Sequence, residues 1–378
     1  MKTLKHLIPV VCLLAFFACK DAFTPEVEAK YKNLLVVEGF INIGEETTIR
    51  LSRTADLQDW QSIIPEKNAE VRIEGDQGAL VQGTTDNNGR CVLQTQNLKL
   101  TEHYRLKLTD AKGKIYETDY LETKAAPEID SVNYKLEGEG FRIYVNTHDQ
   151  ANKTRYYKWD YDETWEIRSD LKSYFEYKNG QVVNRDPNLN ITYCWRNERS
   201  ARILLGSTER LSEDRLTEMP INFVKGNAEK VAFTYSILVK QYGLTQQAYQ
   251  YLRNIKKNTE QIGGIFDSQP SELKGNVYCV SDPQEQVLGW ISAGSMTKKR
   301  LFITDKDKPI GRNWLYIRDC QAFNITKDSL DYYMNGNNGI VDNIGDRWLN
   351  IIGYVIGDNN CIDCRLRGSN IKPDYWPN

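Results

Sequence analysis

Two cysteines near the C-terminus raise the first chemical question, because Cys361 and Cys364 form a CxxC motif. A structural zinc site needs a second ligand pair at a suitable spacing. Cys320 stands alone, and His103 and His148, the two histidines beyond residue 20, are far from the motif in the sequence. A thioredoxin-like redox centre needs the motif at a helix N-terminus after a βαβ unit, which the preceding "GDNN" does not indicate. We therefore expect no metal and no cofactor at this motif.

A second candidate is the carboxylate pair Asp160 and Asp162 in the segment "RYYKWDYDETWEIR". On a strand the two side chains would lie about 7 Å apart on one face, a separation also found between the two acids of glycosidases. A surface hydrolase that uses carboxylates between Asp160 and Glu166 is therefore one hypothesis. The alternative is a solvated strand face without catalytic residues. The sequence has no GxSxG motif that would indicate a serine nucleophile.

The opposite face of the same segment is aromatic. Trp159, Tyr161 and Trp165 share one parity of the strand, so their rings point to one side of the sheet. Exposed rings on a β-surface can stack on sugars or anchor a protein partner. Rings on a buried face would instead belong to the core. The sequence leaves both interpretations open.

The N-terminal residues "MKTLKHLIPVVCLLAFFACK" have the order of a secretory signal peptide, with two lysines before the apolar run Leu7–Ala18. As a helix this run spans roughly 18 Å, too short for a hydrocarbon core of about 30 Å. The residues "FFAC" are similar to a bacterial lipobox. We expect residues 1–18 to be removed, Cys19 to be acylated and residues 19–29 to form a tether. Acyl chains such as palmitate would hold the protein on a membrane; the alternative is an ordinary signal peptide without lipidation.

Charge and composition argue against nucleic-acid binding and favour β-structure. The chain has 49 Lys and Arg against 51 Asp and Glu. Removing the two lysines of the leader leaves 47 against 51, a net charge of about −4, so no basic field is available for nucleic acid. The 22 tyrosines and 8 tryptophans, with many Thr, Val and Asn-Gly turns, are typical of a mostly β protein.

Disulfides are the expected state of paired cysteines in an exported chain. Six cysteines remain once Cys12 and Cys19 are set aside, and they allow 15 connectivities. Cys91 stands alone in the first domain, which predicts a free buried thiol. We expect bridges that tie the tail to the body, one of them through Cys320, with the terminal Tyr-Trp pair docked as an apolar plug. The five candidates would make two bridges with one cysteine left over: Cys194, Cys279, Cys320, Cys361 and Cys364.

Short runs of alternating apolar and polar residues, with turns about every 8 to 12 residues, indicate β-sandwiches. We predict a mainly β fold with two consecutive Ig-like or fibronectin III-like β-sandwich domains. The first covers residues 30–125 and the second 126–304, with a linker at "KAAPEIDS". The second domain carries an irregular insertion at 169–228 and a helix at 245–262. Residues 305–378 are expected to be a loop-rich, disulfide-stapled tail packed on the second domain.

Several segments taken together carry a family resemblance. They are "LLVVEGFIN", "TIRLSRTADL", "YYKWDYDETWEI", "YCW", "IGGIFDSQPSELKGNVYCVSDPQEQVLGWIS" and "CIDCRLRGSNIKPDYW". Over essentially the whole chain after residue 18 they resemble the DUF4249 family, and the N-terminal part also looks like sandwich modules of the carboxypeptidase regulatory type. The resemblance implies a Gram-negative lipoprotein that accompanies a TonB-dependent outer-membrane transporter. It also implies that Cys320, Cys361 and Cys364 are recurring positions, which favours disulfides over a catalytic pair.

The leading functional hypothesis is a lipid-anchored, cell-surface protein of the outer membrane. The charged stretch after Cys19 resembles a surface-export signal, which favours the outer face. The protein would be a non-catalytic accessory or substrate-capture partner of a TonB-dependent transporter, with a glycan or peptide as the ligand. The alternatives are a surface hydrolase acting on glycan or peptide, and a structural adhesin component.

Overall fold

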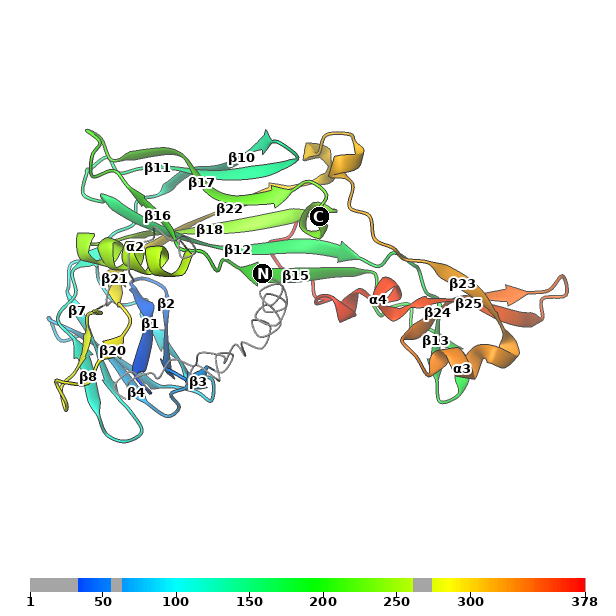
Figure 1. Cartoon of the computed structure of the whole chain (residues 1–378), viewed down its shortest axis with the longest axis horizontal. Helices are drawn as coiled ribbons and strands as arrows, with labels where there is room; N and C mark the ends of the chain where they lie inside the picture. Colours follow the sequence, from blue (N-terminus) through cyan, green and yellow to red (C-terminus); the bar gives the residue numbers. More distant parts are fainter. Residues whose placement is uncertain (1–32, 56–62, 261–273, 378) are drawn as a thin grey trace, which may run out of the picture.

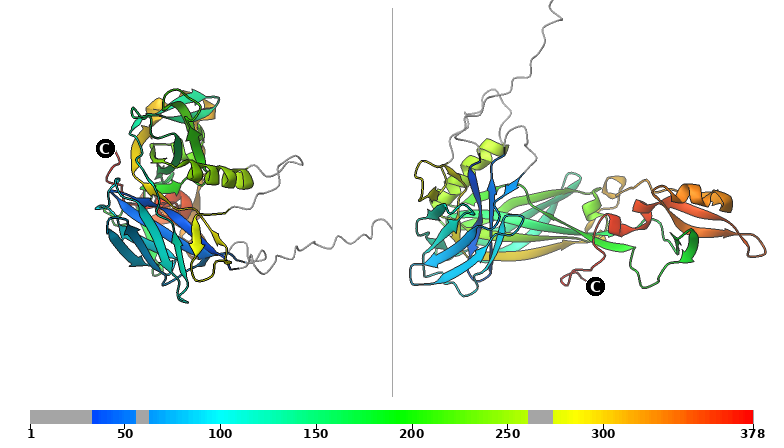
Figure 2. Two further views of the ribbon diagram at one scale, coloured as in Figure 1. Left: turned by 90° about the vertical axis from the view of Figure 1, so that its left-hand side faces the viewer. Right: turned by 90° about the horizontal axis from the view of Figure 1, so that it is seen from below.

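The computed structural model describes residues 33–55, 63–260 and 274–377. The expected signal peptide (1–18) with Cys19 and the tether (19–29) lie outside these described residues. The described chain is mainly β and forms two β-sandwiches and a projecting unit at one end, as two perpendicular views show (Figures 1 and 2). We call this projecting unit the arm. It consists of the strands β13 (Phe175–Lys178), β14 (Gln181–Asn184), β23 (Ala322–Thr326), β24 (Asn338–Gly345) and β25 (Ile351–Asp358) and the helices α3 (Leu330–Met334) and α4 (Asn359–Ile362).

Alternating side chains build the first sandwich. In β4 every second residue is buried, including Val71 and Ile73, and the exposed set points to solvent. The first sheet contains β1 (Leu35–Asn42), β2 (Glu46–Arg53), β3 (Ile64–Pro65), β6 (Arg90–Gln94), β9 (Thr123–Lys124), β20 (Val287–Leu288) and β21 (Ser292–Gly294). The second sheet contains β19 (Val277–Cys279), β8 (Ile115–Thr118), β7 (Tyr104–Thr109), β4 (Glu70–Gly75) and β5 (Leu80–Thr84).

Three short strands of the first sandwich come from late in the chain. β20 and β21 pair in parallel with β1, β21 also pairs with β9, and β19 pairs with β8. The prediction that 126–304 belongs wholly to the second domain is therefore wrong for this segment. The reason is burial, because Val277, Val287, Ile291 and Ala293 are core residues of the first sandwich. Strands of two or three residues show no periodicity from which their partner could be predicted.

The second sandwich is organised around β12, a strand of 13 residues. β18 pairs along one side of β12, while β15 and β16 pair along the other. One sheet contains β10 (Ile129–Glu137), β11 (Gly140–His148) and β17 (Arg215–Lys225). The other contains β15 (Tyr193–Arg199), β16 (Leu204–Ser207), β12 (Tyr156–Arg168), β18 (Tyr235–Gly243) and β22 (Met296–Ile303).

Much of the segment predicted as an irregular insertion, residues 169–228, is regular strand. β15, β16 and β17 all belong to the second sandwich, and β17 pairs with β11 over most of its length. The pairing shifts register after Ile143 and again after Val145, and such bulges interrupt the alternation that identifies a strand. The part that does leave the sandwich forms the hairpin of β13 (Phe175–Lys178) and β14 (Gln181–Asn184).

The one long helix of the described chain, α2 (Gln246–Glu260), lies where the sequence predicts a helix at 245–262. Thr245 caps its N-terminus, since its Oγ1 accepts a hydrogen bond from the backbone N–H of Ala248 at 3.2 Å. Ala248 and Tyr251 are its buried residues. The predicted end of the helix lies outside the described residues.

The tail predicted to be loop-rich contains a three-stranded antiparallel sheet, in the order β23, β25, β24. Its core is small, with Ile325, Leu330, Ile340, Tyr354 and Ile356 buried against the β13–β14 hairpin. Glycines and two register shifts break the alternation of β24 and β25, so no strand period is visible in the sequence. The arm elements of the tail are β23 (Ala322–Thr326), α3 (Leu330–Met334), β24 (Asn338–Gly345), β25 (Ile351–Asp358) and α4 (Asn359–Ile362).

Short 3₁₀ turns connect the remaining elements of the described chain. No helix in the described ranges is both long enough and apolar enough to cross a membrane. The 3₁₀ segments are η4 (Glu229–Val231), η5 (Asp305–Asp307), η6 (Arg312–Trp314), η7 (Lys327–Ser329) and η8 (Cys364–Leu366).

Candidate functional site

Two disulfides lie where the arm meets the second sandwich. Cys194 of β15 is bonded to Cys364 of η8, and Cys320 is bonded to Cys361 of α4. The two cysteines of the CxxC motif therefore have different partners and are not bonded to each other. Trp376 is buried against the second sandwich, with edge contacts to aromatic rings of β15 and β22, which fixes the end of the described chain.

Cys279, a candidate half-cystine, is a free thiol in the structure, and so is Cys91. Both belong to the core of the first sandwich. Cys279 lies on β19, one of the strands that return to that sandwich, whereas the four bonded cysteines lie in the second sandwich and at the base of the arm. Because β19 belongs to the first sandwich, Cys279 lies apart from the bonded cysteines and is not a half-cystine.

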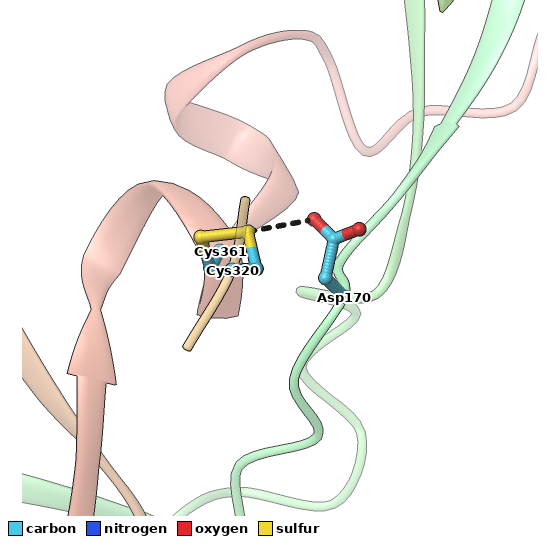
Figure 3. Close-up of side chains that lie close together, drawn as sticks. All are labelled: Asp170, Cys320 and Cys361. Carbon is cyan, nitrogen blue, oxygen red and sulfur yellow. Dashed lines mark hydrogen bonds between the residues drawn. A yellow bond between two sulfur atoms is a disulfide. The ribbon is translucent and has the colours of Figure 1, made fainter. Parts of the chain in front are cut away.

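Asp170, Cys320 and Cys361 bring a carboxylate and two sulfur atoms within 4.8 Å of one another (Figure 3). Asp170 Oδ2 lies 3.3 Å from Cys320 Sγ. A sulfur in a disulfide has neither a proton to donate nor a thiolate charge, so this contact is neither a hydrogen bond nor a metal-binding arrangement. Arg318 Nη1 lies 3.3 Å from the same carboxylate oxygen and Arg367 Nη2 lies 3.9 Å away, so Asp170 is already paired with cations.

The aromatic row of β12 is core. Trp159 is 0%, Tyr161 6% and Trp165 3% exposed, so these rings do not form a binding surface in this structure. Trp159 Nε1 donates a hydrogen bond to Gln241 Oε1 at 2.9 Å, which satisfies the indole inside the sandwich. The odd positions of β12 point inward because the facing sheet of β10, β11 and β17 covers that side of the strand.

The carboxylates of β12 line a groove of about 660 Å³ between the two sandwiches. Asp160 Oδ2 lies 2.9 Å from Lys158 Nζ, and Asp162 Oδ2 lies 2.5 Å from Lys240 Nζ. Each of the two carboxylates therefore already has a cationic partner within the groove. Both carboxylates are about one-third exposed, so these are solvent-screened ion pairs.

Glu166, the last carboxylate of the hydrolase hypothesis, is 8% exposed. Its Oε1 lies 2.6 Å from Arg168 Nε, an ion pair within the same strand. Nothing links Glu166 to the groove, whose lining residues from β12 are Lys158, Asp160 and Asp162. The structure therefore does not bring the carboxylates from Asp160 to Glu166 into one site.

A buried charged cluster that the sequence did not single out lies inside the second sandwich. Glu163 Oε1 accepts hydrogen bonds from the Tyr235 hydroxyl at 2.8 Å and from Asn222 Nδ2 at 3.0 Å. Lys230 Nζ lies 2.6 Å from both Glu163 and Glu198. Burial alone would lower the pKa of Lys230, but these two ion pairs outweigh burial and raise it. Burial and the nearby Glu163 charge raise the pKa of Tyr235 well above its usual range, so its hydroxyl stays a neutral donor to Glu163. With one lysine against two glutamates, of which Glu198 is 55% exposed, the cluster extends from the core to the surface.

A larger cavity of about 1320 Å³ lies where the start of α2 meets the first sandwich. Tyr120, Tyr278 and Trp290 contribute aromatic groups to its lining, and Glu122 and Lys124 contribute charged groups. The Tyr278 hydroxyl donates to Asp119 Oδ1 at 3.1 Å. Aromatic rings beside polar groups in a concave site are typical of small-ligand pockets, so this cavity is the candidate ligand site of the described chain.

Apolar side chains are exposed along the arm and along the segment that leads to it. Trp348 is 75% and Leu349 91% exposed, both in the turn of the β24–β25 hairpin, which Figure 1 shows at the far end from the sandwiches. Apolar groups gathered on an otherwise polar surface commonly mark interaction sites. The other large exposed apolar residues of this part are Val183, Ile310, Leu315, Ile317, Phe323, Tyr332, Ile351 and Ile352.

Comparison with known proteins supports a family assignment without a biochemical role. No curated protein matches the chain. One solved structure that matches is described as "Crystal structure of calcium binding domain CBD12 of CALX1.1"; it is 9% identical, covers 70% of this chain and 98% of that chain, and has a TM-score of 0.16. We draw no conclusion from this likeness.

The family match covers residues 20–300 and is described as "Domain of unknown function (DUF4249)". It includes nearly all strands of both sandwiches and ends before the arm elements of the tail, so it does not extend to the CxxC motif as the resemblance suggested. Because the match spans well over half of the sequence, the chain belongs to the DUF4249 family.

Proposed function

We propose that the protein is a lipid-anchored outer-membrane surface protein that acts as a non-catalytic accessory or substrate-capture partner of a TonB-dependent transporter. The observation that carries this proposal is the arm, a disulfide-fastened unit that displays large apolar side chains away from the two sandwiches. Stable display of apolar groups to water favours a protein whose task is to bind a partner. The signal peptide and the lipobox-like Cys19 in the sequence support export and anchoring.

Binding is favoured over catalysis because the candidate catalytic groups are already neutralised. Asp160 and Asp162 have lysine partners. His103 pairs with Asp76 of the first sandwich, and His148 pairs with Asp130 of the second, so no described histidine accompanies a carboxylate of the groove. The groove therefore offers two ion-paired carboxylates and no histidine among its lining residues, an arrangement that gives acid–base catalysis no specific support.

Substrate capture is supported by the large cavity at α2. Its volume of about 1320 Å³ is large enough for an oligosaccharide or a short peptide, and ligand sites in proteins are commonly 300 to about 1,000 Å³. Tyr120 and Tyr278, each more than 40% exposed, provide stacking faces for such a ligand. Capture in this cavity and docking through the arm are compatible, because the two sites lie on different units.

The test is a co-purification from outer membranes in mild detergent, using the full chain with an affinity tag and an unrelated lipoprotein as control. We expect a TonB-dependent transporter in amounts comparable with the tagged protein and absent from the control. Recovery of the tagged protein from the outer membrane without any such transporter would overturn the accessory role. Cys19→Ala should release the protein from the membrane, and protease added to intact cells should degrade the wild type.

A surface hydrolase and an adhesin give different results in the same system. A hydrolase would turn over glycan or peptide substrates without a transporter, and Asp160→Asn with Asp162→Asn would abolish that turnover. An adhesin would polymerise or bind cells to one another. The proposed accessory shows neither behaviour.

A further inference from the structure

The turn of the β24–β25 hairpin is held rigidly by one aspartate. The Asp346 carboxylate accepts hydrogen bonds from the backbone N–H of Trp348 at 2.8 Å and of Asn350 at 2.9 Å, and from Asn350 Nδ2 at 3.0 Å. The Asp346 N–H donates to Asn350 O at 2.9 Å, and the Leu349 N–H donates to Asp346 O at 3.0 Å. These bonds close the turn around Asp346 and restrict the backbone at Trp348, Leu349 and Asn350.

Leu349 occupies a backbone conformation that disfavours its own side chain. Its φ is 63°, in the left-handed region. Four of the six non-glycine residues with positive φ in the described chain are asparagine, which tolerates this region, and leucine does not share that property. The strain is not offset by burial, since Leu349 is 91% exposed. A strained, exposed apolar residue on a rigid turn indicates a role in binding.

The charge of the surrounding sheet narrows the choice of partner. From Ala322 to Asp358 there are five acidic residues against two basic ones, so this sheet carries a net charge of −3. An anionic lipid surface would repel it, and so would the same sheet of a second copy. The complementary surface is a protein with an apolar socket surrounded by basic side chains. The acidic residues are Asp328, Asp331, Asp342, Asp346 and Asp358, and the basic ones are Lys327 and Arg347.

We propose that Trp348 and Leu349 are the anchor pair of the arm and insert together into an apolar socket with a basic rim on a partner protein. Tryptophan in the centre of an interface commonly dominates the binding energy, and a turn already fixed in its bound shape avoids the entropy cost of ordering on binding. The proposal rests on the proposed function in one respect, namely that the partner is the transporter. The chemistry of the socket follows from the arm itself.

The first experiment places a photo-crosslinking amino acid, p-benzoylphenylalanine, at position 348 of the full chain in the outer membrane. Val92, 46% exposed on β6 of the first sandwich, is the matched control position. We expect a crosslink from position 348, well above the control, to a protein segment that is apolar and flanked by Lys or Arg. A yield no higher than at Val92, a lipid adduct, or a crosslink to a second copy of this chain would overturn the proposal.

The outcomes also separate this proposal from the proposed function. If a transporter co-purifies but position 348 gives no crosslink above the control, the anchor pair is wrong and the accessory role stands. If position 348 crosslinks to a basic-rimmed apolar segment of some other protein and no transporter co-purifies, the accessory role fails and the anchor pair stands.

The second experiment uses Leu349→Gly, which removes the side chain and relieves the backbone strain. Glycine prefers this backbone region, so the melting midpoint should stay the same or rise by about 1–2 °C. Affinity for the captured partner should fall by about tenfold or more. Leu349→Asn is the matched control for conformation and should behave in the same way. Unchanged affinity, or a parallel loss of stability and affinity, would show that Leu349 is not an anchor.

The basic rim is tested by charge reversal on the same hairpin. Asp342 is exposed. Its carboxylate accepts a hydrogen bond from the backbone N–H of the next residue, Asn343, and this bond does not cross the hairpin turn. Asp342→Lys should weaken partner binding several-fold and reduce its salt dependence, because one attractive charge becomes repulsive. Lys135→Glu on β10 of the second sandwich, far along the chain from the arm, should leave binding unchanged. Stronger binding by Asp342→Lys would contradict a basic rim.

Discussion

Cys194 and Cys364 lie 170 positions apart in the chain, and a disulfide holds their Cα atoms 5.7 Å apart. Both cysteines are fully buried in the core of the second sandwich. The bond attaches the segment after the arm to β15, so both ends of the arm are fixed to the same sandwich. A sheet with only five buried core residues of its own gains a stable base from this attachment.

The first prediction concerns the number of thiols. A mature chain acylated at Cys19 should show two free thiols after denaturation without reductant, Cys91 and Cys279, and six after reduction. In the native protein both thiols should be unreactive because they are buried, and burial raises the pKa of Cys91. Thiol labelling read by mass spectrometry measures all three states. Labelling of Cys361 and Cys364 in the native protein would contradict the disulfides.

The second prediction compares the two disulfides. In the loop-closure description, removing a bridge over 41 residues costs about 4 kcal/mol and removing one over 170 residues about 5 kcal/mol. The paired variants Cys320→Ser with Cys361→Ser and Cys194→Ser with Cys364→Ser should therefore differ by about 1 kcal/mol in free energy of unfolding. Denaturant unfolding without reductant measures both values, and a smaller loss for the 170-residue bridge would indicate residual structure in the unfolded chain.

The third prediction concerns the aromatic row. Trp159→Ala removes a fully buried ring and leaves Gln241 Oε1 without its hydrogen-bond donor, so it should lower the free energy of unfolding by about 3–5 kcal/mol. Trp348→Ala makes the same chemical change at an exposed position and should stay within about 0.5 kcal/mol of wild type. Equal effects of the two substitutions, measured by thermal and denaturant unfolding, would contradict the placement of the β12 rings in the core.

The fourth prediction concerns the carboxylates of the groove. Asp160→Asn and Asp162→Asn each remove one solvent-screened ion pair, so each should change stability by about 1 kcal/mol or less. The double variant should capture its partner as well as wild type does. A loss of glycan or peptide turnover in this variant, with the fold unchanged by circular dichroism, would instead favour the hydrolase.

The fifth prediction concerns pH. Burial alone would raise the pKa of Asp307, but hydrogen bonds from the Tyr134 hydroxyl at 2.7 Å and from Thr304 lower it below the usual 3.8. A lowered pKa means that Asp307 stabilises the fold fully above pH 3.8, and that this contribution disappears as the pH falls through the folded-state value. The same hydrogen bond raises the pKa of Tyr134 to about 12.

Asp307→Asn and Tyr134→Phe test this pair, which joins η5 to β10. Each should be destabilised by about 1 kcal/mol at pH 7, and Asp307→Asn should lose less stability than wild type between pH 5 and pH 2. Melting midpoints across this range provide the comparison. Parallel acid profiles for wild type and Asp307→Asn would show that the carboxylate has an ordinary pKa.

Two local patterns in the sequence, the alternation along β12 and the arrangement of the cysteines, predicted part of the structure correctly. Alternation along β12 separated the ring face of Trp159 from the charged face of Asp160, although it could not tell whether that face was core or surface. The cysteine pattern predicted two bridges and one unpaired thiol among five candidates, but not which cysteine was left over. That answer depended on which sandwich Cys279 joins, and a three-residue strand has too few side chains to indicate its partner.

The arm and its anchor pair could not be predicted for a different reason. The stretch Asp346–Ile352 contains four apolar residues, in two adjacent pairs, and gives no period, while its exposure depends on a turn that the side chain of Asp346 closes. The left-handed conformation of Leu349 leaves no trace in the sequence, because leucine is not the residue that such a position normally selects. A search for Asp-x-x-x-Asn turns could have found the hairpin.

The late strands of the first sandwich have a consequence for the order of folding. β20 and β21 complete its first sheet and end at Gly294, and β22 completes the second sandwich and ends at Ile303. Neither core can close until some 300 residues of the chain are available, because each sandwich needs a strand from the same late stretch. Such long-range closure slows folding and leaves apolar strand edges exposed in the meantime. The two sandwiches should therefore mature together in one late cooperative step.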